Sequence, residues 1–175
     1  MSRTLAILVG LALLFGAIKL AGDRGRRAEF DDNALAVGTP VAVFRLPDAA
    51  GRFFRLPTPG RPILINYWAS WCGPCLQEMP ILQDFSRRNG SSGPQVVGIA
   101  LDPPHDTRAW LADHPQPYPI LLESPSEGDS SERLGNRRGL LPFTVLVGAD
   151  GRLLATRTGP FADAADLEAF VQAAR

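Results

Sequence analysis

The two cysteines of the chain, Cys72 and Cys75, lie in the segment Trp71-Cys72-Gly73-Pro74-Cys75, which follows a predicted strand and opens a predicted helix. A helix N-terminus carries about half a positive charge and unpaired N–H groups, which stabilise a thiolate. We therefore predict that Cys72 is a nucleophile. Cys75 lies one helical turn further on, close enough to form a disulfide with Cys72 and to resolve a mixed disulfide.

Two other interpretations of the cysteine pair remain open. The pair could form half of a zinc site, with His105 and His114 as its partners, although these histidines are distant in sequence and lack close ligand spacing. The pair could also form a purely structural disulfide. We predict no metal site and no cofactor other than a redox-active Cys72–Cys75 disulfide.

The elements that must position the pair form a strand–helix–strand unit. The apolar run 63–68 predicts a strand buried on both faces, and helical spacing of apolar residues predicts a helix over 72–88, kinked at Pro80. The apolar run 96–101 predicts a second buried strand. Two such strands joined through a helix pair in parallel with a right-handed crossover.

Shorter patterns surround this unit. Turn residues between apolar runs predict two hairpins, and further helical and apolar patterns predict the remaining elements. The hairpins are 41–46 with 53–56 and 144–147 with 153–158; the other elements are helices at 106–113, 130–138 and 163–174 and a strand at 118–122. This order predicts an α/β sandwich with a mixed central β-sheet flanked by helices.

Composition excludes several classes of protein. The chain has 175 residues, of which 45% are hydrophobic and 21% charged, which is typical of a globular protein rather than a disordered one. Its 18 basic and 18 acidic residues give a net charge of zero, without the basic surplus of a nucleic-acid-binding protein. Two cysteines are too few for a disulfide-stabilised scaffold.

An apolar N-terminal segment precedes the predicted domain. Residues 5–18 carry no charge, but this run is short for a transmembrane helix, which needs about 17–25 residues. It predicts a signal peptide or signal anchor over 1–22, a linker over 23–37 and a folded domain over 38–175. Because small residues are not correctly placed for cleavage, we favour an uncleaved anchor formed by residues 4–22.

Residues 66–80, NYWASWCGPCLQEMP, resemble the active-site segment of the TlpA/ResA-like thiol–disulfide oxidoreductases, a branch of the thioredoxin superfamily. The resemblance extends over residues 38–175. It implies a thioredoxin-like fold with an N-terminal β-hairpin and a central insertion. It also implies a periplasmic or otherwise extracytoplasmic domain, often anchored to the inner membrane, that reduces disulfides in other proteins.

The resemblance assigns roles to two residues outside the cysteine pair. Glu78 matches an acid that lies three residues after the second cysteine, where it would take up or hold back the proton of Cys75. A solvated surface glutamate is the alternative. Pro142 matches the cis-proline that faces the cysteine pair, and it would expose the backbone of Leu141 for strand-like pairing with a substrate.

Other residues near the motif refine this assignment. We expect Trp71, Gly73 and Pro74 to contact the substrate, with Leu141 and Pro142 opposite them, and we expect Trp68 to lie in the core.

Asn66 stands where thioredoxin has a buried aspartate, so it cannot accept a proton, and we interpret it as a polar residue at the end of its strand. Ala69 and Ile65 occupy positions where peroxiredoxins need Thr and Pro, which argues against peroxidase chemistry.

The sequence thus predicts an extracytoplasmic protein-disulfide reductase. Its clients would be exported proteins such as apocytochrome c, and the protein would then act in cytochrome c biogenesis. A membrane electron donor of the thiol type would return the oxidised protein to its reduced form. We expect no nucleic-acid partner. The alternatives are a disulfide oxidase or isomerase, and a non-enzymatic module that senses redox state or binds a metal or a haem protein.

The charges around the N-terminal segment conflict with this location. One basic residue precedes the apolar run and several follow it; these are Arg3 before, and Lys19, Arg24, Arg26 and Arg27 after. The positive-inside rule would place the chain that follows the segment in the cytoplasm. The sequence alone does not resolve this conflict.

Overall fold

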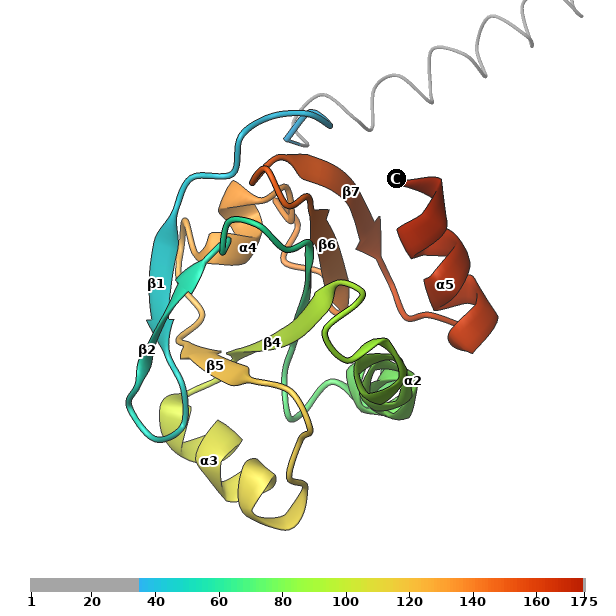
Figure 1. Cartoon of the computed structure of the whole chain (residues 1–175). Helices are drawn as coiled ribbons and strands as arrows, with labels where there is room; N and C mark the ends of the chain where they lie inside the picture. Colours follow the sequence, from blue (N-terminus) through green and yellow to red (C-terminus); the bar gives the residue numbers. More distant parts are fainter. Residues whose placement is uncertain (1–34, 175) are drawn as a thin grey trace, which may run out of the picture. The chain divides into compact units, whose positions relative to one another are not determined.

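A five-stranded mixed β-sheet forms the centre of the protein (Figure 1). The structure, a computed structural model, describes residues 35–174. In spatial order the strands are β5 (Ile120–Glu123), β4 (Gln95–Leu101), β3 (Ile63–Trp68), β6 (Phe143–Val147) and β7 (Leu153–Thr158). β3 pairs in parallel with β4 and antiparallel with β6, so the predicted mixed sheet is confirmed.

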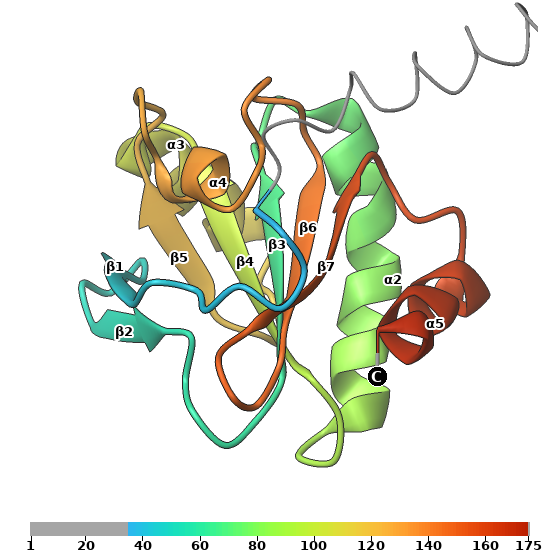
Figure 2. The ribbon, with the colours of Figure 1, turned by 90° about the horizontal axis from the view of Figure 1, so that it is seen from above.

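Helices and a hairpin cover the two faces of the sheet. Figure 2 shows α2 (Gly73–Asn89) and α5 (Ala164–Ala173) on one side of it. The antiparallel hairpin of β1 (Phe44–Pro47) and β2 (Phe53–Leu56) lies on the other side. The remaining helices, which lie in the β4–β5 and β5–β6 connections, are α3 (Pro104–Asp113) and α4 (Ser130–Arg133).

The alternation of side chains along β3 divides the core into two clusters. Leu64 and Trp68 pack against α2 and α5, whereas Ile65 and Tyr67 pack on the opposite face with the hairpin side of the molecule. All six residues of β3 are buried, as the sequence predicted. Asn66 lies on the same face of β3 as Leu64 and Trp68, so its amide faces α2. It lies in the middle of the strand, whereas we predicted it at the strand end.

Most predicted elements are confirmed with small shifts of their ends. α2 starts one residue later than predicted, with Cys72 as its N-cap, and β5 starts at Ile120 instead of residue 118. The largest difference is α4, which was predicted to reach residue 138 but ends at Arg133. Gly135 follows with a φ of 112°, a conformation that a helix cannot contain.

The start of the described chain is tied to the sheet. Leu35 packs against the core cluster on the hairpin side, and Gly38 N–H donates to the carbonyl of Leu153 at 2.7 Å. Segment 1–22, with the predicted anchor at 4–22, and residues 23–34 of the predicted linker lie outside the described residues. Between residues 35 and 174 no helix is both long and apolar enough to cross a membrane.

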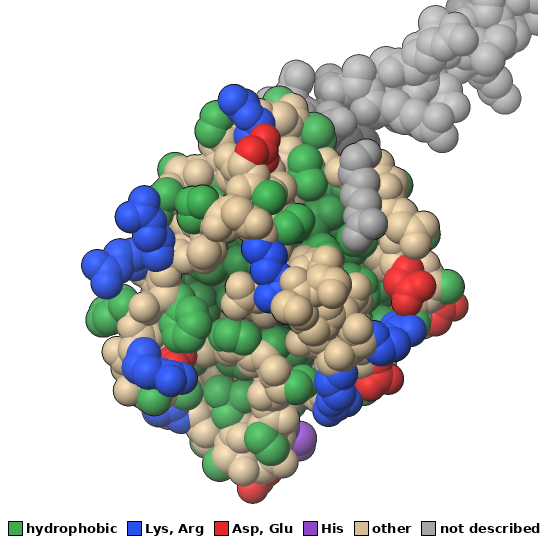
Figure 3. Space-filling view, in the orientation of Figure 1, with side chains coloured by type: hydrophobic (Ala, Val, Ile, Leu, Met, Phe, Trp, Pro, Cys, Tyr) green, Lys and Arg blue, Asp and Glu red, His purple; other side chains and the backbone are tan. Residues whose placement is uncertain are grey.

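Charged side chains are spread over the surface. On the face shown in Figure 3, arginine side chains stand in separate places, several of them beside acidic ones. Arg52 pairs with Asp48 at 2.7 Å and Arg133 approaches Glu123 at 4.0 Å. Pairing of this kind distributes positive and negative charge instead of concentrating either.

Gly98 of β4 lies where a side chain would crowd its neighbours. A Cβ atom there would lie 2.5 Å from Cδ1 of Ile120 and 3.2 Å from Nε1 of Trp68. We expect Gly98→Ala to lower the free energy of unfolding, measured by urea titration, by about 1–3 kcal/mol through overpacking. Ile120→Val removes the Cδ1 atom, so the double variant should lose less than the sum of the single losses. Additive losses would contradict this explanation.

Candidate active site

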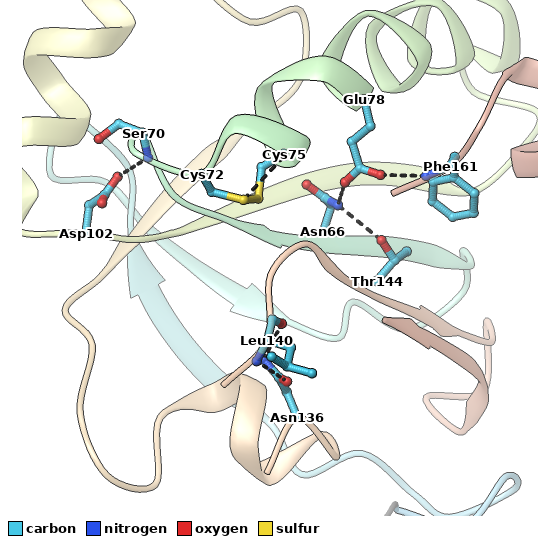
Figure 4. Close-up of a disulfide and its surroundings, with 10 residues drawn as sticks. All are labelled: Asn66, Ser70, Cys72, Cys75, Glu78, Asp102, Asn136, Leu140, Thr144 and Phe161. Atoms are coloured by element: carbon cyan, nitrogen blue, oxygen red, sulfur yellow. Dashed lines mark hydrogen bonds between the residues drawn. A yellow bond between two sulfur atoms is a disulfide. The ribbon is translucent and has the colours of Figure 1, made fainter. Parts of the chain in front are cut away.

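The cysteine pair lies at the N-terminus of α2, as predicted (Figure 4). Cys72 and Cys75 form a disulfide, with Cys72 at the N-cap position. The Sγ atom of Cys72 accepts a hydrogen bond from Cys75 N–H at 3.3 Å, and Gly73 and Pro74 form the first positions of the helix. Proline suits this place because the first N–H groups of a helix have no partner within it.

The two cysteines differ in their access to solvent. The exposed fraction is 5% for Cys72 and 0% for Cys75. Beside them the indole of Trp71 is 72% exposed, which is unusual for so large an apolar side chain. Of the two cysteines, Cys72 is therefore the more accessible one, and an exposed indole precedes it in the chain.

A buried carboxylate supports the turn that precedes the cysteines. Asp102, directly after β4, accepts a hydrogen bond from Ser70 N–H at 2.7 Å, and Cys72 N–H donates to the carbonyl of Ala69 at 3.1 Å. Asp102 was not among the predicted site residues. The parallel pairing of β3 and β4 was the available signal, because the ends of parallel strands meet at one edge of the sheet.

Glu78 lies on the buried face of α2, one turn beyond Cys75. Its exposed fraction is 1%, so the alternative of a solvated surface glutamate is wrong. One carboxylate oxygen accepts from Asn66 Nδ2 at 2.7 Å and the other from Phe161 N–H at 3.0 Å (Figure 4). Both oxygens are thereby held in place from outside the helix.

Asn66 joins this carboxylate to the sheet. Its Nδ2 also donates to Thr144 Oγ1 at 3.1 Å, and Thr144 is its register partner on β6. Asn66 was predicted to be a polar structural residue, but its bond to Glu78 was not predicted. The available indication was the alternation of side chains between the two faces of β3, which places Asn66 on the face that α2 covers.

Burial raises the pKa of Glu78 above its ordinary value of 4.5. The hydrogen bonds from Phe161 and Asn66 and the positive charge of Arg157 act in the opposite direction but do not outweigh desolvation. Arg157 itself pairs with Asp166 at 2.7 Å. A carboxyl group with a raised pKa holds a proton to higher pH and exchanges it more readily near neutrality.

The loop before β6 contains the predicted cis-proline. The Leu141–Pro142 peptide bond is cis, and the Pro142 carbonyl accepts from Gly159 N–H at 2.8 Å. Leu141 is half-buried and precedes β6, so its peptide groups lie outside the sheet ladder. Earlier in the same loop, the side chain of Asn136 makes two hydrogen bonds to the main chain of Leu140. This contact was not predicted.

The remaining candidate residues, Trp68, His105 and His114, make packing and pairing contacts away from the cysteine pair. Trp68 is fully buried, as expected, with its ring centroid 4.9 Å from that of Trp110. His105 pairs with Asp106, and His114 stacks on Trp110 at the other end of α3. Within the part of the chain that the structure describes, no cluster of three His, Cys, Asp or Glu side chains is arranged to hold a metal ion.

This arrangement of a Cys-x-x-Cys pair at a helix start beside a parallel strand defines a thioredoxin-like thiol–disulfide oxidoreductase, the class that the sequence predicted. Residues 36–171 match the Redoxin family, and the chain belongs to that family.

Known relatives agree with this class. The chain is 32% identical over 162 residues to the thiol:disulfide interchange protein DsbE of Escherichia coli strain K12, covering 86% of this chain and 83% of that protein. It is 26% identical over 133 residues to the thiol–disulfide oxidoreductase ResA of Geobacillus thermodenitrificans, covering 74% and 73%. A Chlorobium tepidum structure provisionally assigned as DsbE has a TM-score of 0.70 and 28% identity, covering 81% and 99%.

The raised pKa of Glu78 predicts a pH-dependent stability. Between pH 4.5 and the folded-state pKa, the folded protein retains a proton that the unfolded chain has released, so the free energy of unfolding falls as pH rises through this window. Glu78→Gln has no such proton. We measure the free energy of unfolding by denaturant titration of the oxidised proteins. As pH rises, we expect the value for wild type to fall relative to the value for Glu78→Gln. A difference that stays constant across this range would refute the assignment.

Proposed function

We propose that this thiol–disulfide oxidoreductase works as a reductase of disulfides in exported proteins, with Cys72 as nucleophile, Cys75 as resolving thiol and Glu78 as proton carrier. The observation that carries the proposal is the fully buried carboxyl group of Glu78, placed one helical turn behind the resolving cysteine. A buried carboxyl with a raised pKa suits proton exchange with a thiol better than a solvated one does.

The reaction proceeds by two thiol–disulfide exchanges. In the reduced protein the Cys72 thiolate bonds to one sulfur of the client disulfide, and the other client sulfur leaves as a thiolate and takes up a proton. Cys75 then loses its proton, bonds to the Cys72 sulfur and expels the second client thiolate. The client gains two electrons, and the enzyme is left with the Cys72–Cys75 disulfide.

Glu78 acts in the second exchange. Cys75 is completely buried, so bulk solvent cannot readily take its proton. Residues three apart on a helix are neighbours, at about 5–6 Å between their Cβ atoms, so Glu78 is near enough to accept this proton directly or through one water. Asn66 and Phe161 hold the carboxyl group while its charge changes.

The substrate would approach over Trp71 and the cis-proline loop. The exposed Trp71 indole supplies apolar contact area beside Cys72, and the Leu141 peptide lies outside the sheet ladder, where an extended client segment can pair with it. Gly73 is exposed and has open space where a side chain would project, which leaves room for the client backbone.

The resemblance of residues 66–80 to the TlpA/ResA-like oxidoreductases supports an extracytoplasmic location. We propose a periplasmic domain, anchored to the inner membrane by residues 4–22, with clients such as apocytochrome c. A membrane electron donor of the thiol type would return two electrons to the Cys72–Cys75 disulfide by the same exchange chemistry.

Cysteine variants test the assignment of roles. We expect Cys72→Ala to abolish reduction of insulin disulfides in a turbidity assay, because no nucleophile remains. Cys75→Ala should instead accumulate mixed disulfides with client proteins, visible on non-reducing gels after acid quenching. Undiminished turnover by Cys72→Ala would refute the mechanism, and a strongly oxidising potential of the couple would favour a disulfide oxidase.

A kinetic prediction isolates Glu78. Glu78→Gln keeps the size of the side chain but cannot accept a proton, so resolution of the mixed disulfide should slow by about 10²-fold while attack by Cys72 is little changed. Stopped-flow single-turnover measurements separate the two steps. The matched control is Gln77→Ala on the exposed side of the same turn, which should leave both steps unchanged. Equal slowing of both steps by Glu78→Gln would contradict a specific role in resolution.

A further inference from the structure

The connection between β7 and α5, residues 159–163, supplies a main-chain donor to Glu78. Phe161 N–H donates to Oε2 of the carboxyl group at 3.0 Å (Figure 4). The Phe161 side chain is buried, and its ring centroid lies 5.5 Å from that of Phe170. Because the donor lies in a loop and not in a helix or strand, its direction depends on the contacts that hold this loop.

Arg157, near the end of β7, binds the same peptide group from its other side. Nη2 of the guanidinium donates to the Pro160 carbonyl at 3.1 Å, and Cζ lies 4.6 Å from the centroid of the Phe161 ring. The Pro160 carbonyl and the Phe161 N–H belong to one trans peptide group and point in opposite directions. One planar group therefore connects the guanidinium of Arg157 to the carboxyl of Glu78.

Asp166, in the first turn of α5, fixes both Arg157 and the loop. Its two carboxylate oxygens accept from the two Nη atoms of Arg157, each at 2.7 Å, and its Oδ2 also accepts from Ala162 N–H at 3.0 Å. The hydrogen bonds from Arg157 and Ala162 lower the pKa of Asp166, so the ion pair stays charged near neutral pH. A two-bonded pair of this kind restricts the guanidinium to one orientation.

We propose that Arg157 is a positioning residue for proton transfer by Glu78, and that it acts through the Pro160–Phe161 peptide group. The inference rests on the proposed function, because it concerns the proton that Glu78 takes from Cys75 in the second exchange. It adds a means of giving that proton up again: a fixed N–H donor favours the carboxylate, which must be restored before the next turnover.

Two opposing effects decide how readily Glu78 exchanges a proton. Burial favours the neutral carboxyl group, whereas the hydrogen bond from Phe161 and the positive charge of Arg157 favour the carboxylate. Arg157 acts directly through its charge, and a positive group at the carbonyl end of a peptide also strengthens donation by its N–H. Without these contacts the carboxyl group would keep its proton to higher pH, and less carboxylate would be ready to accept the proton of Cys75.

Two further ionisable groups lie near Glu78. Tyr118 is buried, and its burial and the negative charge of Glu78 raise its pKa above the ordinary value of 10.0, so it stays uncharged near neutral pH. Cys75, one turn earlier on α2, is the group that exchanges its proton with Glu78. A pH dependence of resolution that disappears in Glu78→Gln therefore reports on the carboxyl group.

The test measures resolution of a mixed disulfide as a function of pH. Reduced protein is mixed with stoichiometric dithiobis(nitrobenzoate), which releases one coloured thiolate in each of the two exchanges. Stopped-flow absorbance gives the rate of the second release from about pH 5 to about pH 9. We expect the wild-type rate to rise with pH along a limb that Glu78→Gln lacks.

Arg157→Lys separates the hydrogen bonds of the guanidinium from its charge. Lysine stays positive but cannot bind Asp166 and Pro160 with a planar fork. The limb should move to higher pH by at least about half a unit, which is about threefold in rate on the limb, while the rate at high pH stays within about twofold of wild type. Because the Phe161 ring remains packed on Phe170, it should continue to exclude water from the carboxyl group.

Two further variants complete the comparison. Arg157→Gln also removes the charge, so its limb should move at least as far as that of Arg157→Lys. The matched control is Arg152→Lys, just before the other end of β7, where the arginine likewise pairs with an acid, Asp150 at 3.6 Å, and donates to a main-chain carbonyl, that of Gly38 at 2.7 Å. This control should leave the position of the limb unchanged.

The outcomes separate this inference from the proposed function. A limb that keeps its wild-type position in Arg157→Lys would overturn the positioning role, even if Arg157→Gln moves it. Equal slowing by Arg157→Lys at every pH would show a purely structural role and would also overturn the inference. If wild type and Glu78→Gln gave the same rates at every pH, the proposed role of Glu78 would itself be wrong.

Discussion

The carboxyl group of Glu78 lies between helix α2 and the central sheet, where water cannot satisfy it, and its burial constrains the rest of the domain. A buried carboxyl is costly unless donors reach both oxygens. Here the donors come from distant parts of the chain, namely Asn66 in β3 and Phe161 just before α5. Thr144 on β6 holds the Asn66 amide in turn. The sheet order, the packing of α2 and the start of α5 must all be correct before this group is satisfied.

The framework of the fold was predictable because its signals are local in sequence. The apolar run of β3, the turn at Asp150-Gly151 and the helical spacing along α2 each identify an element without reference to its neighbours. Predictions were less accurate at the ends of elements. α4 ends early because Gly135 turns the chain into the loop in which Asn136 binds the main chain of Leu140. This glycine was a local stop signal, and the predicted helix over 130–138 ran past it.

The same distinction applies to the active site. Cys72 and Cys75 were identifiable from their spacing, and Glu78 and Pro142 from the resemblance of their segments to a known family. The partners of these residues were not identifiable in this way, because they are defined only by proximity in the folded chain. Asp102 lies 32 residues from Ser70, and Thr144 lies 78 residues from Asn66. Side chains that satisfy a buried group from such distances carry no sequence pattern of their own.

The capping of α2 by Cys72 has a consequence for the energetics of the redox couple. The sulfur that changes oxidation state is also the group that accepts a hydrogen bond from the first turn of the helix. Redox state and helix capping are therefore linked in a thermodynamic cycle. If the Cys72 thiolate caps the helix with a more favourable free energy than the disulfide sulfur does, the same difference in free energy favours the reduced form of the protein. In this way, the N-terminus of α2 contributes to the reduction potential of the Cys72–Cys75 couple.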